Sequence, residues 1–209
     1  MNENEWAESI CKLISSINLS FPGDHDDVEV KVETLRKLPY ASEIIEYDNN
    51  FIALKQDNVK FETDLLIYEK KENIIKPRII IEAKLSRIST HDAITYSYKA
   101  QNHKNITPFI RYGIIIGKRK HFPLPGRLFR HGSNFDFMMS FIGEDPTIEE
   151  KETFTNMIKK ELRYSRQFEE MLTNSRSSNR KRYYVMQKEL RLEELSQVTN
   201  AELNTKIQD

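Results

Sequence analysis

Three charged side chains stand in apolar segments, where charges are unusual. Asp64 lies within FETDLLIYE (61–69), and Glu82 and Lys84 end the segment RIIIEAK (78–84). Side chains alternate between the two faces of a strand, so Glu82 and Lys84 project from one face. A charge in such a position is costly to desolvate unless it is paired or binds a metal ion. An ion pair between Glu82 and Lys84, or a strand end that reaches water, is the structural alternative.

Antiparallel pairing of these two segments would bring Asp64 beside Glu82, because only the turn-like KKENIIKP separates them. Two carboxylates and the main-chain carbonyl of Ala83 suit Mg²⁺, which prefers oxygen ligands and retains several waters. Lys84 would then lie next to the attacking water or a scissile phosphate oxygen. A divalent ion and a nearby cation are what phosphodiester hydrolysis needs. We therefore expect Asp64, Glu82 and Ala83 to bind Mg²⁺, for which Mn²⁺ can substitute.

The remaining sequence predicts the elements that must position these residues. Apolar side chains at helical spacing predict a first helix over 5–18 and a second from Asp26 or Asp27 to Leu38, before Pro39. Short isoleucine-rich strands are expected at 51–55, 61–69, 78–84 and 111–117. A helix is expected at 90–104, between the last two of these strands. A strand, a helix and another apolar strand indicate a parallel step that is buried on both faces.

The chain changes character after Gly117. One more strand is expected at 135–142. From Pro146 onward a helical hairpin is expected, in which Thr147 and Glu150 fit a capping box, the first helix ends near Leu172 and the second runs from about Arg180 to Leu203. The order of elements predicts an α/β fold with a mixed central sheet flanked by helices, a core at 1–145, and a C-terminal helical hairpin at 146–209 that packs on the core or forms a dimer.

An acidic residue followed by an apolar strand that ends in (D/E)-x-K resembles the PD-(D/E)XK nuclease superfamily, which includes many restriction endonucleases. The motif here is Thr63-Asp64 followed by Glu82-Ala83-Lys84, and the resemblance covers roughly residues 26–117. It implies a restriction endonuclease-like core, Mg²⁺-dependent DNA cleavage and frequent dimerisation. Asp64 and Glu82 become metal ligands, and Lys84 becomes the base that orients water or phosphate.

The chain departs from the family pattern in two places. Thr63 stands where members often have proline, and the glutamine that many members carry in the next helix has no counterpart near Ile94 and Thr95. Gln101, about two turns later, is a candidate phosphate contact or a surface residue.

Family members often add a glutamate from the helix before the sheet. Glu29 and Glu33 on the expected second helix are the candidates, and Glu29 is the one we choose as a catalytic residue. A solvated helix face is the alternative for both.

Basic residues are concentrated in two loops. The stretch 118–131 contains no acid, and a second basic turn follows near residue 180. Such clusters bind phosphates locally even in a protein without net charge, although solvated surface is the alternative. The expected DNA contacts are Lys118, Arg119, Lys120, Arg127, Arg130, Arg180, Lys181 and Arg182.

The composition limits the class of protein. Lys plus Arg and Asp plus Glu number 32 each, so net charge argues neither for nor against nucleic acid. The single cysteine, Cys11, excludes an internal disulfide and a cysteine-based zinc site. No apolar run approaches the roughly 20 residues of a membrane helix, and the start lacks a signal-peptide pattern. A cytoplasmic protein without a membrane partner is expected.

These observations lead to one main hypothesis and two alternatives. The chain is expected to be a Mg²⁺-dependent endonuclease of the restriction type that acts on duplex DNA, as a homodimer or with separate subunits. A repair, recombination or mobile-element nuclease of the same fold is one alternative. A non-catalytic DNA-binding or assembly protein that retains the fold is the other. Such proteins usually lose an acid or the lysine of the motif, whereas Asp64, Glu82 and Lys84 are all present here.

Overall fold

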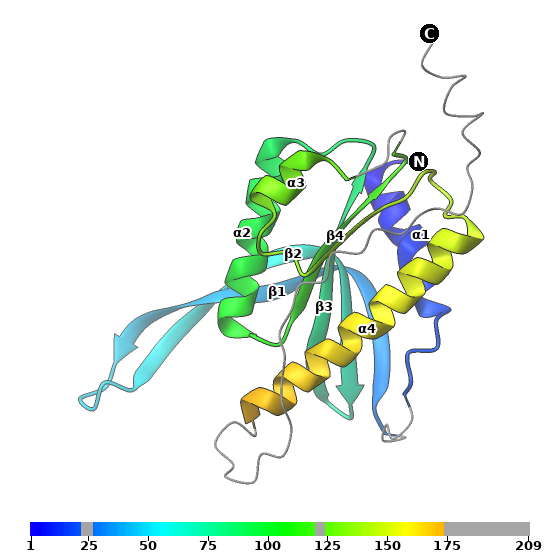
Figure 1. Ribbon diagram of the computed structural model, residues 1–209. Coiled ribbons are helices and arrows are strands. Elements are labelled where there is room, and N and C mark those ends of the chain that lie inside the picture. The colour runs from blue at the N-terminus through cyan, green and yellow to red at the C-terminus, as the bar shows by residue number, and fades with distance from the viewer. Residues whose placement is uncertain (22–26, 120–123, 174–209) are drawn as a thin grey trace, which may run out of the picture. The chain divides into compact units, whose positions relative to one another are not determined.

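A mixed five-stranded sheet forms the centre of the computed structural model, which describes residues 1–21, 27–119 and 124–173 (Figure 1). The strands follow one another in sequence order, with the bounds Glu29–Tyr47 for β1, Ala53–Lys71 for β2, Ile74–Leu85 for β3, Arg111–Gly117 for β4 and Phe137–Ser140 for β5. Neighbours pair antiparallel from β1 to β3 and parallel from β3 to β5. The predicted mixed sheet flanked by helices is therefore confirmed.

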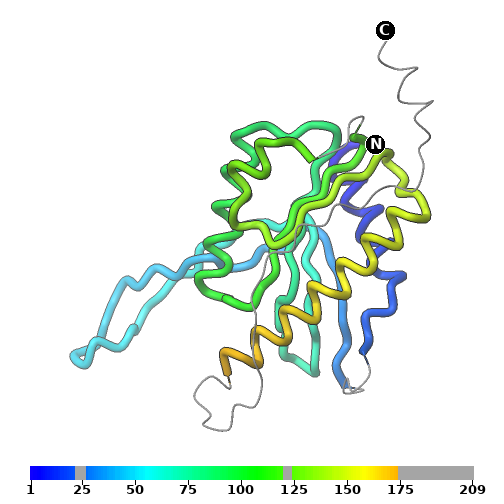
Figure 2. The backbone as a smooth tube through the Cα atoms, viewed as in Figure 1, coloured from blue at the N-terminus to red at the C-terminus, as the bar shows by residue number. Residues whose placement is uncertain are grey.

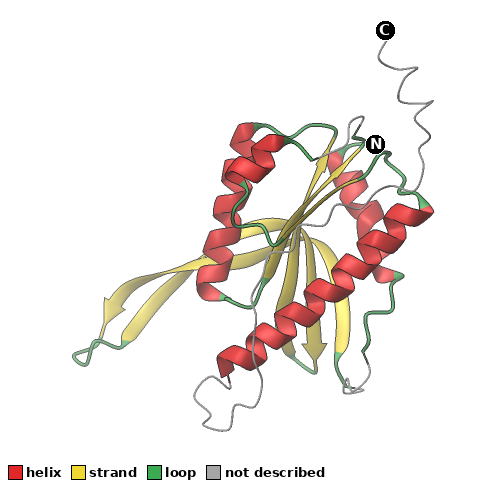
Figure 3. Cartoon of the chain, viewed as in Figure 1, coloured by secondary structure: helices red, strands yellow, loops and turns green. Residues whose placement is uncertain are grey.

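Two layers of helices cover the two faces of this sheet (Figure 3). Helices α1 (Glu3–Ser15) and α4 (Ile148–Thr173) pack on one face, and α2 (Thr90–Ile106) and α3 (Gly126–His131) pack on the other. Helix α2 joins β3 to the parallel strand β4, so the predicted strand–helix–strand step is confirmed. None of the helices within the described ranges is long and apolar enough to cross a membrane.

The isoleucines of β3 divide between the two layers. Ile79 and Ile81 belong to the apolar cluster beneath α1 and α4, whereas Ile80 belongs to the cluster beneath α2 and α3. All three are fully buried. A strand that is covered on both faces needs apolar side chains at successive positions, which explains the run of isoleucine.

The second helix expected before Pro39 is wrong, because residues 29–47 form strand β1. Apolar residues at 28, 32, 35 and 38 match a helical period, but the chain pairs with β2 from Glu29↔Lys70 to Tyr47↔Ala53. Val32 packs in the cluster beneath α1 and α4, and Leu38 packs in the opposite one. Leu35 lies between them with a φ of 55°, so the inward positions of β1 change face there. Tertiary pairing overrides the local periodicity.

The outer part of the β1–β2 hairpin projects from the sheet as a two-stranded arm (Figure 2). We define the arm as residues 39–60. Strand β3 pairs with β2 only at Leu65 and beyond, so β1 is the strand that pairs with β2 within the arm. The strands expected at 51–55 and 61–69 are thus parts of one long strand.

Helix α4 begins as the sequence predicts, and it packs on the sheet. The amide of Glu150 donates to Thr147 Oγ1 and the amide of Thr147 donates to Glu150 Oε2, which is the predicted capping box. Phe154, Ile158 and Leu162 are buried in the cluster that α1 shares. The second helix expected from Arg180 lies outside the described residues.

Candidate active site

Strands β2 and β3 bring Asp64 and Glu82 together at the edge of their paired region. The register pairs Leu66 with Ile80 and Leu65 with Ile81, so the next step places Asp64 opposite Glu82. Asp64 Oδ2 accepts a hydrogen bond of 2.7 Å from the amide of Ala83, which holds the carboxylate across the strand pair. The expected proximity of the two acids is therefore present.

Glu82 is buried among groups from α2 and β4. Its side chain is 1% exposed, the hydroxyl of Tyr112 donates to Oε1, and Lys99 Nζ lies 3.8 Å from the same oxygen. Among the described residues no hydrogen bond reaches Oε2. Burial, followed by the charge of Asp64, raises the pKa of Glu82 to about 7, against the opposing effect of Lys99.

Asp64 shares this electrostatic environment. Burial raises the pKa of its carboxyl, although the amide of Ala83 and the charge of Lys84 act in the other direction. Both carboxyl groups therefore ionise less readily than usual. A cation bound between them would offset the repulsion between their negative charges.

Lys84 projects toward α1 and α2 from the same face of β3 as Glu82. Its ammonium lies 3.0 Å from Glu3 Oε2 and 5.1 Å from the centre of the Tyr96 ring. Burial alone would lower the pKa of Lys84, but hydrogen bonding to Tyr96 and Glu3 outweighs it and raises the pKa above its usual range. Lys84 is therefore a charged hydrogen-bond donor at neutral pH. Its ion-pair partner is Glu3, and not Glu82 as the structural alternative from the sequence required.

Packing of α1 against β4 positions Glu3. Trp6 is fully buried beside Gly117, where an added Cβ would lie 2.5 Å from the indole ring. Glu3, in the first turn of the helix, thereby reaches the end of β3, where its Oε1 accepts from the amide of Leu85 at 3.3 Å. Asn2 and Glu5 form a capping box that fixes this turn.

Sequence reasoning missed four neighbours of the predicted triad, namely Glu3, Tyr96, Lys99 and Tyr112. Tyr96 and Lys99 are three positions apart in α2, so both lie on one helical face. The ammonium of Lys99 lies 5.1 Å from the Tyr96 ring centre and 5.4 Å from that of Phe61. An aromatic residue and a lysine at this spacing, in the helix that follows the (D/E)-x-K motif, could have identified Tyr96 and Lys99 from the sequence.

The donor set fits a hard divalent cation. Within the described ranges no three acidic, histidine or cysteine side chains converge as metal ligands, so Asp64 and Glu82 would be completed by the Ala83 carbonyl and water. Mg²⁺ is commonly held by one or two carboxylates, with the other positions filled by water and substrate phosphate.

Glu29 and Glu33 lie outside this cluster. The helix that was to carry them is strand β1, and Glu29 pairs with Lys31 at 3.0 Å, beside Lys70 of β2. Glu33 accepts from the Tyr68 hydroxyl at 2.9 Å and pairs with Arg36. A helix does place a glutamate beside the three predicted residues, but that glutamate is Glu3 of α1. The position of Glu29 therefore does not support its choice as a catalytic residue.

Two of the predicted DNA contacts, Arg119 and Arg127, lie beside the segment that follows Lys84. Arg119 donates to the carbonyl of Ser86 at 3.1 Å and Arg127 to that of Ile88 at 3.0 Å, so both guanidinium groups hold the segment that follows Lys84. Lys118 pairs with Glu144 at 2.9 Å.

The other predicted contacts are placed differently. Arg130 is exposed at the end of α3. Gln101 is exposed on α2 and donates to Asn105. Lys120, Arg180, Lys181 and Arg182 lie outside the described residues.

No protein-family model matches the chain, and the search of curated proteins finds no match.

Proposed function

We propose that this chain is a Mg²⁺-dependent endonuclease with a restriction endonuclease-like core of the PD-(D/E)XK type, and that it hydrolyses phosphodiester bonds of duplex DNA. The observation that carries the proposal is the meeting of Asp64, Glu82 and Lys84 at one edge of the β2–β3 pair, in the order and on the strands that the motif implies.

The energetics of the two acids support a metal-binding role. Glu82 is 1% exposed, and the charge that acts on it most strongly is the like charge of the Asp64 carboxylate, so an ordinary structural explanation would need a close cationic partner. The nearest ammonium, Lys99, lies 3.8 Å away. Lys84 pairs with Glu3 instead of with Glu82. The excess negative charge is compensated when a divalent cation binds both carboxylates.

Each residue then has a distinct part in the reaction. Asp64, Glu82 and the Ala83 carbonyl would hold the ion, which when bound lowers the pKa of water and neutralises charge on phosphorus. Lys84 is protonated, so it orients the attacking water or binds a phosphate oxygen by donating hydrogen bonds. Tyr112 donates to Oε1 of Glu82 and fixes the carboxylate. Lys99 adds a second positive charge beside the reacting phosphate.

The surrounding cations support a polyanionic substrate. Arg119 and Arg127 donate to backbone carbonyls of the segment after Lys84, so their charges lie beside that segment, where they would contact a phosphate backbone bound at the carboxylates. Lys99 lies over two aromatic rings, Tyr96 and Phe61, in the same region. Positive charge concentrated around the carboxylates would offset their repulsion of DNA.

The test is cleavage of supercoiled plasmid and linear duplex DNA with Mg²⁺, Mn²⁺, Ca²⁺ or excess EDTA. We expect cutting with Mg²⁺ or Mn²⁺, binding with little cutting in Ca²⁺, and none in EDTA. Discrete fragments support a restriction-type endonuclease, whereas progressive loss from the ends of linear DNA indicates an exonuclease. DNA binding without cleavage under every condition would favour the non-catalytic alternative.

A further inference from the structure

The tip of the β1–β2 arm exposes an unusual amount of apolar surface. Six large apolar side chains lie within residues 43–54, and their exposure runs from 45% for Ile44 to 86% for Phe51. The others are Ile45, Tyr47, Ile52 and Leu54. Exposed apolar patches of this kind mark interaction surfaces. We call residues 43–54 the arm tip.

The charge of the arm tip excludes some partners. Glu43, Glu46 and Asp48 carry three negative charges, and the nearest cation is Lys55, the cross-strand partner of Glu46, at the base of the tip. Asp48 Oδ1 also accepts from the amides of Asn50 and Ile52, which stabilises the turn. An acidic surface is repelled by a phosphate backbone, so the tip is suited to a protein surface that is basic and aromatic.

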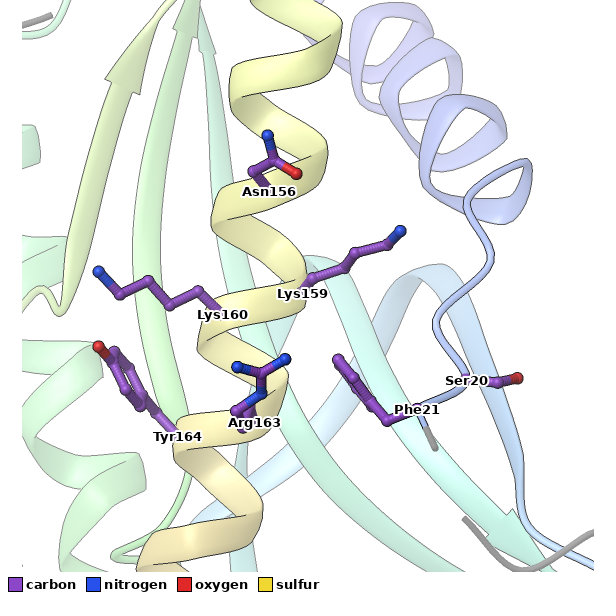
Figure 4. A pocket seen from close by; sticks show the side chains of 7 residues that line it. All are labelled: Ser20, Phe21, Asn156, Lys159, Lys160, Arg163 and Tyr164. Carbon is purple, nitrogen blue, oxygen red and sulfur yellow. The ribbon is translucent and has the colours of Figure 1, made fainter. Parts of the chain in front are cut away.

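A surface of that chemistry lies on α4 of the same chain. A hollow of about 410 Å³ is lined by Lys159, Lys160 and Arg163 together with the rings of Phe21 and Tyr164 (Figure 4). The guanidinium of Arg163 lies 5.3 Å from the centre of the Phe21 ring. The described residues that line this hollow include no acidic side chain. We call it the α4 pocket.

We infer that the arm tip of one chain docks in the α4 pocket of a second copy, and that the contact is reciprocal. Strands β1 and β2 are paired along the arm, and the arm projects from the sheet apart from α4 of its own chain (Figure 1). Two complementary surfaces on one chain can join copies either as a closed pair or as an open head-to-tail series, and the closed pair, in which each arm embraces its partner, is the inferred arrangement. This inference is independent of the proposed function.

The available area is sufficient for a stable dimer. Large side chains bury on the order of 150 Å² each when they are covered. Six that are about half exposed or more therefore offer on the order of 500 Å² per tip. Two tips alone offer on the order of 1,000 Å², which is the lower limit for a biological interface.

Charge reversal tests the pairing of tip with pocket. The mass of the full chain is measured by light scattering and sedimentation, without DNA, for wild type, for Glu43→Lys/Glu46→Lys and for Lys159→Glu/Arg163→Glu. We expect wild type at twice the chain mass of 24.8 kDa and each double variant at the monomer mass, with a dimer Kd at least tenfold weaker. Lys151→Glu, an exposed position on the same helix, serves as the control and should remain dimeric.

Mixing the two double variants gives the decisive result. In a heterodimer the reversed tip meets the reversed pocket and the wild-type tip meets the wild-type pocket, so both contacts are complementary. We expect a 1:1 mixture of the two monomeric variants to form a dimer, and circular dichroism to show that each is folded. A monomeric wild type, reversed variants that remain dimeric, or a mixture that remains monomeric would overturn the inference. Because the readout is mass, failure of the dimer is distinguishable from absence of nuclease activity.

Discussion

Glu82→Gln is the substitution that separates a metal-binding carboxylate from a structural one. The amide keeps the shape of the side chain and can still accept the Tyr112 hydrogen bond, but it removes the buried charge. In the folded protein the pKa of Glu82 is about 7, above its usual 4.5. Glu82 therefore contributes stability fully below pH 4.5, and this contribution is lost as the pH rises through 7.

The magnitude follows from this difference in pKa. Each pKa unit corresponds to about 1.4 kcal/mol, so ionisation of Glu82 costs the metal-free protein about 3 kcal/mol well above pH 7. Glu82→Gln removes that cost. For a chain of this size, about 2–4 °C accompany each kcal/mol, so we expect the variant to melt about 6–12 °C above wild type at pH 8.5 in EDTA. Near pH 4.5 the two proteins should melt together.

Thermal unfolding with and without metal completes the assay. Mg²⁺ at 100 times its Kd stabilises a folded protein by about 2.7 kcal/mol, so it should raise the melting temperature of wild type and leave Glu82→Gln almost unchanged. Glu62→Gln, at an exposed position of β2, is the matched control and should show neither effect. Equal melting temperatures for wild type and Glu82→Gln at pH 8.5 in EDTA would refute the reasoning.

Three further outcomes are expected. Arg78→Ala should lower the free energy of unfolding in urea by about 1.5–3 kcal/mol, because it removes the partner at 2.6 Å from the buried carboxylate of Glu69, which keeps its ion pair with Arg166. Lys76→Ala, in a largely exposed pair, should cost less than about 1 kcal/mol. Burial lowers the pKa of His103 to about 4, so the contribution of His103 to stability should fall as the pH drops from about 6.5 to 4, and the melting temperature of His103→Phe relative to wild type should rise over that range. Arg127→Ala/Arg130→Ala should reduce the log–log salt slope of DNA binding by about 0.9 per lost phosphate contact, and an unchanged slope would show that these arginines do not contact DNA.

Local pattern was sufficient for the strand–helix–strand part of the fold. The isoleucines of β3 and β4 fill both faces, and Ser89 and Asp92 form a capping box at the start of α2. The hairpin between β2 and β3 is short, so antiparallel pairing could place Asp64 against Glu82 from the sequence alone.

Strand β1 could not be predicted in the same way. Its apolar residues do not alternate regularly, because Leu35 has a positive φ and the inward face changes between Val32 and Leu38. The resulting spacing imitates a helix. Only pairing with β2, a nonlocal interaction, determines the strand.

The rest of the candidate site depends on nonlocal packing as well. Glu3 precedes Lys84 by about 80 positions and reaches it because Trp6 packs beside Gly117. Tyr112 reaches Glu82 because β4 lies parallel to β3, with Glu82 paired to Ile114. Residue types alone give no indication of these contacts.

The central claim is tested most directly by the single-turnover rate of DNA cleavage by Lys84→Ala in Mg²⁺. Lys84 is a protonated donor, and an ammonium group has no lone pair for a metal, so its loss should remove cutting while Mg²⁺ still raises the melting temperature as in wild type. Lys70→Ala, on β2 beside Glu29, is the control and should cut normally. The account predicts a rate for Lys84→Ala that is lower by at least two to three orders of magnitude, by analogy with loss of one transition-state donor. A folded Lys84→Ala protein that cuts DNA at the wild-type rate would contradict it.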